Sequence, residues 1–114
     1  MESTELILLY DYYGEMLTPR QRQCFELRYH QDFSLGEIAQ ELRVSRQGVY
    51  DNLNRAEALL RNMEAKTGFV RREMQCRQAA RVVIAAGEKL EKHPEEAVRA
   101  LAREILSAAR ELEE

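Results

Sequence analysis

The sequence predicts an all-α fold of about six helices, and two observations lead to this class. Hydrophobic residues make up 45% and charged residues 32% of the 114 residues, so the chain has enough apolar surface to bury a core. Two prolines and five glycines leave long stretches rich in Ala, Leu, Glu and Arg, which form helices well, and no run of alternating β-branched residues interrupts them. We expect one domain over residues 1–67 and a helical extension over residues 68–114.

The first helix is expected over residues 4–17, where ELILLYDYYGEML is apolar on nearly every side. A helix this short with so many apolar residues packs against several neighbours. Its three tyrosines are therefore expected in the core with their hydroxyls at the rim, and stacking on nucleic-acid bases is the alternative. These tyrosines are Tyr10, Tyr12 and Tyr13.

The second helix is expected to begin at Thr18 and to end near Tyr29. Thr is a favoured N-cap and the following Pro is favoured at the first helical position. Arg20 and Arg22 lie in its first turn, where positive charge opposes the helix dipole. They either cover a solvated surface or lie over a phosphate backbone.

Two further helices, separated by a tight turn, are predicted between residues 34 and 60. Ser34 and Glu37 fit a capping box, so a helix begins at Ser34 and ends near Leu42. Only residues 43–44 separate it from Ser45, which is a second favoured N-cap. A short helix, a tight turn and a second helix form a helix-turn-helix, whose second helix enters the major groove of DNA.

The helix that begins at Ser45 is expected to bury one face and to expose another. Apolar residues recur along it at intervals of four, three and four, as Val49, Leu53, Ala56 and Leu60. Arg bonds guanine with two hydrogen bonds, and Gln or Asn bonds adenine in the same way. The candidates for base contact are the polar residues outside the apolar stripe, namely Arg46, Gln47, Tyr50, Asp51 and Asn54.

Other residues of this helix are candidates for contact with phosphates. The helix N-terminus, capped by Ser45, offers backbone amides to an anion, and Arg55 and Arg61 lie further along. Asp51 would repel the DNA backbone, which counts against this hypothesis. Gly48 weakens the helix by about 1 kcal/mol relative to Ala, and it is either tolerated or permits close approach to the wall of the groove.

The segments YDYYGEMLTPRQRQCFELRYHQDFSLGEIAQEL and VSRQGVYDNLNRAEALL closely resemble the YlxM family, also called p13 or UPF0122. The resemblance covers residues 1 to about 73, and SRQGVYDNLNR is a highly specific run. It implies a helix-turn-helix similar to region 4 of sigma factors and a DNA-binding regulator. The family's genes commonly neighbour that of the signal recognition particle GTPase, from which a role in that pathway has been inferred. This sequence departs from the pattern at Arg43, where many helix-turn-helix proteins have Gly, and at Gly48, where Ala is usual in the family.

The extension is expected to contain a helix over residues 69–90 and a last helix that Pro94 begins. Apolar residues in the last helix recur at spacings of three, four, three and four, as in a coiled-coil seam. This seam is too short to be stable alone, so it packs either on residues 69–90 or on a partner chain. A homodimer would suit a protein that binds paired half-sites. The seam residues are Val98, Leu101, Ile105, Ala108 and Leu112.

Catalysis, metal binding and membrane insertion have little support in the sequence. The chain has no phosphate-binding glycine loop and no nucleophile in a known setting, so no enzyme activity and no cofactor are expected. The isolated Cys24 and Cys76 are expected to be buried structural residues, and with His30 and His93 they are too scattered to predict a metal site. The N-terminus lacks the pattern of a signal peptide, and no apolar run could cross a membrane, so we expect a cytoplasmic protein.

The formal net charge of −3 argues against a protein that binds nucleic acid over a wide surface. Any such contact must come from a local patch, because residues 1–17 contain four acidic residues and no basic one. Two functions therefore stay open. One is a DNA-binding regulator, and the other is an adaptor that uses the same fold to bind the GTPase or the RNA of the signal recognition particle.

Overall fold

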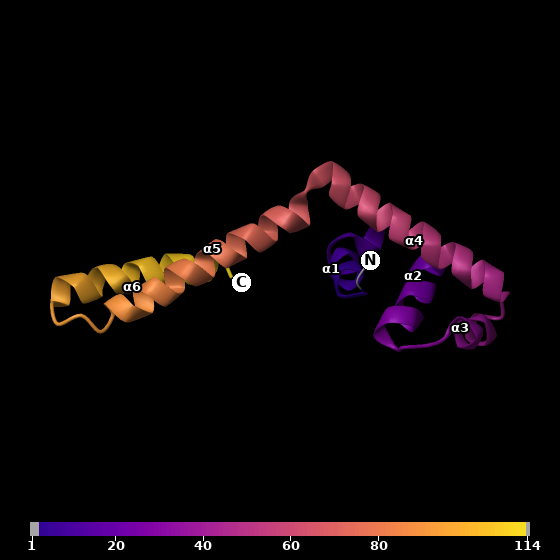
Figure 1. Cartoon of the computed structure of the whole chain (residues 1–114), viewed down its shortest axis with the longest axis horizontal. Coiled ribbons are helices and arrows are strands. Elements are labelled where there is room, and N and C mark those ends of the chain that lie inside the picture. The colour runs from indigo at the N-terminus through magenta and orange to yellow at the C-terminus, as the bar shows by residue number, and fades with distance from the viewer. Residues whose placement is uncertain (1–2, 114) are drawn as a thin grey trace. The chain divides into compact units, whose positions relative to one another are not determined.

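The structure of the chain is a computed structural model that describes residues 3–113 (Figure 1). Within that range it contains six α-helices and no strand, which confirms the all-α class. The helices are α1 (Ser3–Tyr13), α2 (Pro19–Phe25), α3 (Leu35–Leu42), α4 (Arg46–Thr67), α5 (Phe69–Leu90) and α6 (Glu96–Glu111). A 3₁₀ turn, η1 (Gly14–Met16), follows α1, and a π-helical turn, η2 (Glu26–His30), follows α2. The chain divides into two compact units at the boundary between residues 68 and 69.

N-capping residues set the starts of three helices in the first unit. Thr18 and Ser34 each form a capping box, in which the hydroxyl oxygen accepts a hydrogen bond from the amide three residues later, at 3.2 and 3.1 Å. Ser45 accepts the corresponding hydrogen bond at 2.9 Å. Each cap pairs an amide that the helix itself cannot satisfy. The predicted starts of α2, α3 and α4 are therefore confirmed.

The tyrosines of α1 hold this helix against the rest of the first unit. Tyr10 and Tyr13 are buried, and their hydroxyls donate hydrogen bonds to the carboxylates of Glu26 and Glu64. These two tyrosines thus occupy the core with their hydroxyls at its rim, as predicted. The helix ends earlier than expected, because the chain tightens into η1 at Gly14, where an added Cβ would lie 3.0 Å from Cε1 of Tyr10.

The second predicted helix changes character after Phe25, although the sequence indicated a regular α-helix to Tyr29. Residues 26–30 form the π-helical turn η2, in which the Gln31 amide donates to the Glu26 carbonyl at 3.2 Å. The wider turn brings two aromatic rings onto Phe25: the ring of Tyr29 lies 4.5 Å from it and that of His30 lies 6.2 Å away. Tyr10 of α1 stacks on Phe25 and lies edge-on to His30 at 5.5 Å, so another helix packs on the rings at this turn.

The helix-turn-helix has its own core between α2, α3 and α4. Its buried members are Cys24, Ile38, Ala39 and Val49, and larger, partly buried apolar side chains surround them. Along α4 the predicted stripe is confirmed, because Val49, Ala56 and Leu60 are fully buried and Leu53 packs at the edge of the core. Burial of this stripe determines which side of α4 faces solvent.

Arg43 closes the turn between α3 and α4 in the left-handed conformation, with φ 57° and ψ 47°. The amide of Val44 donates to the carbonyl of Ala39 at 3.0 Å, which completes the helix end. Gly adopts this conformation without steric cost, whereas other L-residues lose about 1 kcal/mol or more. The sequence predicted either a sigma-like turn or a mildly strained one. The positive φ of Arg43 shows that the backbone is strained at this residue.

We predict that Arg43→Gly stabilises the first unit by about 1 kcal/mol, because glycine removes this strain. For a domain of this size the melting temperature would rise by roughly 4–8 °C. Thermal unfolding followed by circular dichroism measures the shift. Arg43→Ala is the matched control, since it removes the side chain and keeps the strain. A glycine variant no more stable than the alanine variant would contradict the prediction.

The second unit is an antiparallel hairpin of α5 and α6. Two ion pairs run between the helices, Arg81 with Glu113 and Arg110 with Glu88, each at 3.3 Å. At Gly87 the helices come close: an added Cβ would lie 2.7 Å from Cδ2 of Leu106, which is itself buried. The predicted helix over residues 69–90 is confirmed.

The last helix packs on residues 69–90, as one of the two alternatives predicted, but its start and the residues at the contact differ from expectation. The last helix begins at Glu96 rather than at Pro94, because the Arg99 guanidinium binds the carbonyls of His93 and Pro94, each at 2.8 Å, and holds these residues outside the helix. The predicted seam does not face α5. The residues of α6 that are buried on α5 are each one position later, namely Ala102, Leu106 and Ala109.

Of the two cysteines, Cys24 is buried as predicted and Cys76 is not. Cys24 is buried in the helix-turn-helix core, and this burial raises the pKa of its thiol. Cys76 is exposed, so its predicted burial is wrong. The reason is that Cys76 lies on α5 outside the row of residues that α6 covers.

Candidate nucleic-acid interface

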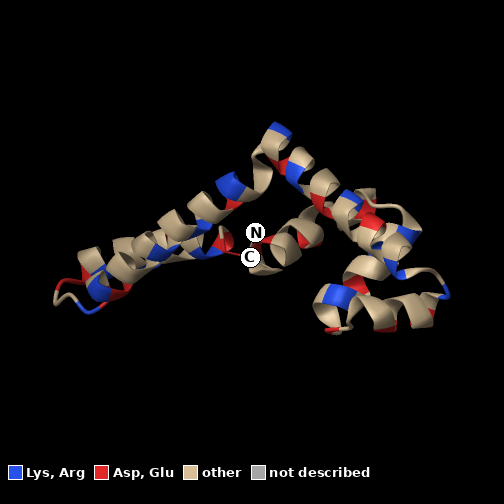
Figure 2. Ribbon diagram, turned by 45° about the vertical axis from the view of Figure 1, so that its right-hand side comes forward, with Lys and Arg blue, Asp and Glu red and all other residues tan. Residues whose placement is uncertain are grey.

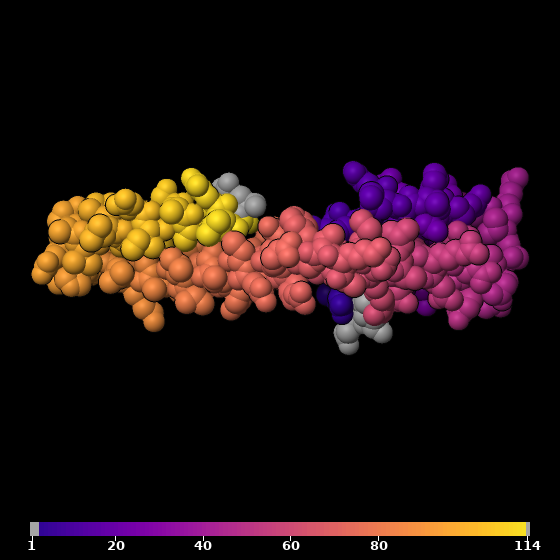
Figure 3. All heavy atoms as spheres, turned by 90° about the horizontal axis from the view of Figure 1, so that it is seen from above, coloured from indigo at the N-terminus to yellow at the C-terminus, as the bar shows by residue number. Residues whose placement is uncertain are grey.

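The exposed side of α4 carries the side chains that the sequence proposed for base contact. Arg46, Gln47, Tyr50 and Asn54 are all exposed, because Val49 and the rest of the apolar stripe turn the opposite side into the core. Figure 3 shows the outer side of α4 open along its length in that view. The helix therefore presents polar side chains that can form hydrogen bonds directly to solvent or to a ligand.

Three of the proposed residues form one line along this helix. Gln47, Asn54 and Arg61 are separated by seven residues each, nearly two helical turns, so their side chains leave α4 in similar directions. Arg61 lies about 21 Å from Gln47 along the axis at 1.5 Å per residue. The major groove is about 12 Å wide, so with Gln47 at the bases Arg61 would lie beyond the groove, near the phosphates.

Asp51 has a role that the sequence did not predict. The Gln47 side-chain amide donates a hydrogen bond to Oδ1 of Asp51 at 3.0 Å, one helical turn away. This contact orients the Gln47 amide and leaves its carbonyl oxygen and one N–H available to a base edge. Spacing of four residues on a helix was the pattern that could have indicated the pair. Asp51 therefore positions the Gln47 side chain. The negative charge of Asp51 is still expected to repel phosphates.

A shallow hollow separates the starts of α3 and α4. It is lined by Leu35 of α3 and by Arg46, Gln47 and Tyr50 of α4. The Arg46 side chain reaches over the first turn of α3, because Nε lies 4.0 Å from the position that a Cβ on Gly36 would occupy. Two helix N-termini thus border the same hollow, and both favour negative charge.

Arg20 and Arg22 are not brought together, although both were proposed for phosphate contact. They differ by two positions on α2, so they leave the helix on nearly opposite sides. The Arg20 guanidinium donates to the carbonyl of Leu42 at 3.5 Å, at the end of α3. Arg22 lies beside Tyr10, and hydrogen bonding to that hydroxyl, with the nearby carboxylates of Glu26 and Glu15, raises the pKa of Arg22. Of these two arginines, only Arg20 lies at the turn that leads into α4.

Basic residues gather at this turn. Arg20 reaches it from α2, Arg43 forms it, and Arg46 follows it in the first turn of α4. Figure 2 shows basic residues at the turn and along α4, with carboxylates between them. The sequence did not single out Arg43 as a site residue, because its place in the cluster depends on the left-handed turn.

The remaining proposed residues differ in their surroundings. Ser45 is engaged as the N-cap of α4: its hydroxyl oxygen accepts from the Gly48 amide at 2.9 Å, and its O–H can still donate to a phosphate. Arg61 forms an ion pair with Glu57 at 3.2 Å, which a phosphate would have to displace. Arg55 is exposed about 80° around α4 from the line of Gln47 and Asn54. Arg55 could therefore reach only the phosphates at one side of the helix.

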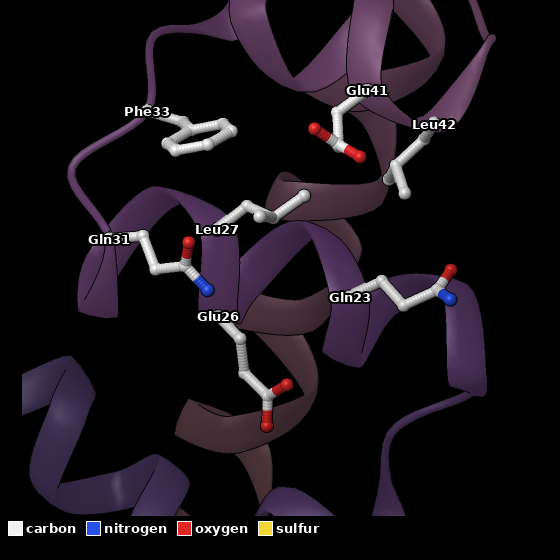
Figure 4. Close-up of a pocket in the computed structure, with 7 residues that line it drawn as sticks. All are labelled: Gln23, Glu26, Leu27, Gln31, Phe33, Glu41 and Leu42. Atoms are coloured by element: carbon white, nitrogen blue, oxygen red, sulfur yellow. The ribbon is translucent and has the colours of Figure 1, made fainter.

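A second hollow in the first unit lies between α2, η2 and α3 (Figure 4). Its lining is apolar at Leu27, Phe33 and Leu42 and includes the carboxylates of Glu26 and Glu41. No Lys or Arg is among its lining residues, so phosphates would be repelled there. Negative charge and apolar area make this hollow unsuitable for nucleic acid.

Residues 3–113 contain neither a metal-binding cluster nor a membrane-spanning helix. No group of three or more His, Cys, Asp or Glu side chains in that part of the chain is arranged to hold a metal ion. Among the same residues, no helix is long and apolar enough to cross a membrane.

Comparison with known proteins shows similarity over most of the chain. The sequence profile of UPF0122, described as "Putative helix-turn-helix protein, YlxM / p13 like", matches residues 1–98, which is further than the resemblance seen in the sequence. A UPF0122 protein of Thermoanaerobacter sp. is 53% identical over 70 residues, 61% of this chain and 60% of the relative. A UPF0122 protein of Geobacillus kaustophilus is 51% identical over 70 residues, which cover 61% of this chain and 64% of the relative. A UPF0122 protein of Exiguobacterium sibiricum is 44% identical over 95 residues, and the match covers 73% of this chain and 90% of the relative. The match with the Thermoanaerobacter relative thus spans less than two thirds of that relative's length.

Proposed function

The chain belongs to the UPF0122 family of YlxM/p13-like helix-turn-helix proteins, and on this premise we propose that it is a cytoplasmic regulator that binds DNA. Binding rather than catalysis is the proposed activity. The observation that carries the proposal is the exposed polar side of α4, which begins at a capped N-terminus beside a cluster of arginines. In a helix-turn-helix these first turns are the part that reaches base edges.

The residues of α4 contact different parts of the DNA, according to how far each side chain extends. Arg46, Gln47 and Asn54 are assigned to base edges, and Tyr50 to the wall of the same hollow. The N-terminal amides at Ser45 are assigned to a phosphate. Sequence preference would then come from the first group, whereas the amides would set the register of α4 on the DNA.

Phosphate contacts are assigned to the basic residues at the two ends of the exposed side. Arg20 lies at the turn, and Arg55 and Arg61 lie further along α4. Arg22 contributes least to this proposal, because it lies among Tyr10 and carboxylates. With few phosphate contacts and a net charge of −3, we expect binding that is weak at physiological salt and strengthens as salt is lowered.

The experiment is a salt titration of binding to the DNA upstream of the protein's own gene, compared with a scrambled duplex. We predict that Arg61→Ala lowers the affinity equally for both duplexes and reduces the slope of log K against log salt by about one, because one phosphate contact is lost. Arg103→Ala in α6 is the matched control, since Arg103 is exposed and pairs with Glu96 in a similar ion pair at 2.8 Å. Absence of binding below about 50 mM salt would overturn the proposal.

A second candidate is an adaptor that binds the GTPase or the RNA of the signal recognition particle. The negative net charge favours contact with the GTPase over extensive contact with DNA or with the particle RNA. The immobilised chain would be incubated with purified GTPase and with the particle RNA in separate experiments. Retention of either one, together with no DNA binding in the salt titration, would favour the adaptor. Retention of neither would reject it.

A further inference from the structure

The hairpin of α5 and α6 leaves large apolar side chains in solvent. On α6, Leu101, Ile105 and Leu112 are 60%, 41% and 53% exposed, and on α5, Val83 and Leu90 are both 42% exposed. Soluble single-chain proteins seldom expose several large apolar residues on one contiguous surface.

These residues lie in two rows, one on each helix. Both rows have spacings of four, three and four. The α5 row is Ala79, Val83, Ala86 and Leu90, and the α6 row is Leu101, Ile105, Ala108 and Leu112. Most members of each row come one position before a residue that is buried or partly buried in the hairpin: Val83 precedes Ile84, and Ile105 precedes Leu106. One position is a rotation of about 100° around a helix, so both rows are displaced in the same rotational sense from the line where the helices touch.

Because α5 and α6 are antiparallel, rotation in the same sense moves both rows to the same side of the hairpin. They form one continuous apolar surface, which we call the hairpin face. It consists of Ala79, Val83, Ala86, Leu90, Leu101, Ile105, Ala108 and Leu112.

We propose that the hairpin face binds the same face of a second copy of this chain, which gives a four-helix bundle with two-fold symmetry. The two rows can interleave: with Gly87 level with Leu106, Leu90 falls between the levels of Leu101 and Ile105, and Val83 falls between those of Ala108 and Leu112. A two-fold axis parallel to the helices places α6 of one copy on α5 of the other, antiparallel, so that the side chains of the two rows alternate along the axis.

The area of the hairpin face reaches what a specific dimer needs. The 16 residues of α6 are about 24 Å long, and two adjacent helices are about 20 Å wide. Two copies would together cover on the order of 1,000 Å², which is the lower bound for a specific interface. The dimer is therefore expected to be reversible and to depend on protein concentration.

Charges at the edge of the hairpin face also fit this arrangement. Gly87 lies beside Leu106, so Glu104, two positions before Leu106, lies level with Lys89, two positions after Gly87. Under the two-fold axis, Glu104 of one copy comes level with Lys89 of the other, at the outer edge of the bundle. Both side chains are exposed in the single chain. The dimer would contain this pair of opposite charges twice.

The test measures the mass of the full chain in solution by sedimentation equilibrium, without DNA, so its outcome is independent of the proposed DNA binding. The wild type is expected to approach twice its mass of 13.3 kDa as concentration rises. Leu101→Glu is expected to weaken the dimer by roughly 100-fold or more, because two carboxylates would be buried per dimer. Ser107→Glu is the matched control, since Ser107 is exposed and turned about 100° or more around α6 from each α6 member of the hairpin face. Circular dichroism checks that each variant keeps its helix content.

A charge exchange tests the arrangement of the helices. Glu104→Lys and Lys89→Glu should each weaken the dimer several-fold, and the double variant should restore it, because opposite charges meet again. A wild type that stays monomeric at its solubility limit, or a dimer that Leu101→Glu does not weaken, would overturn the proposal. A double variant as weak as the single ones would overturn the stacking of α6 on α5 of the second copy.

Discussion

Replacing Arg46 and Gln47 together by alanine is expected to remove the DNA sequence preference of this protein. Both side chains are exposed in the first turns of α4 and border the same hollow, and Asp51 holds the Gln47 amide in place at 3.0 Å. Each bidentate contact with a base discriminates by about 1–3 kcal/mol. The loss of two such contacts should reduce the preference for the specific duplex over a scrambled one by on the order of 100-fold or more.

Fluorescence anisotropy with the two duplexes at one fixed salt concentration measures this ratio. The double variant should still bind both duplexes weakly, because the arginines at the phosphates remain. Arg72→Ala with Gln75→Ala in α5 is the matched control, since it removes the same two residue types from exposed positions of the second unit. If the preference persists in the α4 variant, its first turns do not contact the bases.

Phe25→Ala is expected to have the largest effect on stability. Phe25 is 1% exposed, stacks on Tyr10 with ring centroids 4.5 Å apart and planes 7° apart, and contacts Tyr29 at the same centroid distance. Its truncation leaves a cavity where α1, α2 and η2 meet and removes both aromatic pairs. The free energy of unfolding of the first unit should fall by about 3–5 kcal/mol, a large part of the total for a domain of this size.

Urea unfolding followed by circular dichroism measures this loss. Tyr50→Ala serves as the control, because Tyr50 is an aromatic residue of the same unit that is 50% exposed. Its substitution should change stability by about 0.5 kcal/mol or less. A Phe25 variant that loses less than about 1 kcal/mol would show that the packing of α1 and η2 on this ring contributes little.

The parts of the candidate site that were predictable depend on contacts within one or two helical turns. Ser34 and Ser45 begin helices because a hydroxyl at an N-cap bonds an amide three residues later, wherever the helix lies in the fold. Val49, Ala56 and Leu60 are buried as a stripe because their spacing matches the helical period. Together these features predicted which side of α4 would be exposed.

Other parts of the site depend on which residues from distant segments lie nearby. Arg20 and Arg22 are equivalent in sequence, yet the first reaches the end of α3 and the second reaches Tyr10 of α1. The rings at the π-helical turn likewise contact Tyr10, which comes from another helix. Such contacts leave no periodic pattern, so no local rule predicts them.

The all-α class, the helix starts at Thr18, Ser34 and Ser45, and the buried side of α4 follow from local sequence patterns, because hydrogen bonds and helical periodicity act locally. Which of two adjacent stripes on α6 packs on α5 depends instead on contacts between the two folded helices. Both stripes have suitable spacing, but the absence of a side chain at Gly87 leaves room for Leu106 and so selects its stripe. The other stripe, with the larger side chains, is left in solvent as part of the hairpin face.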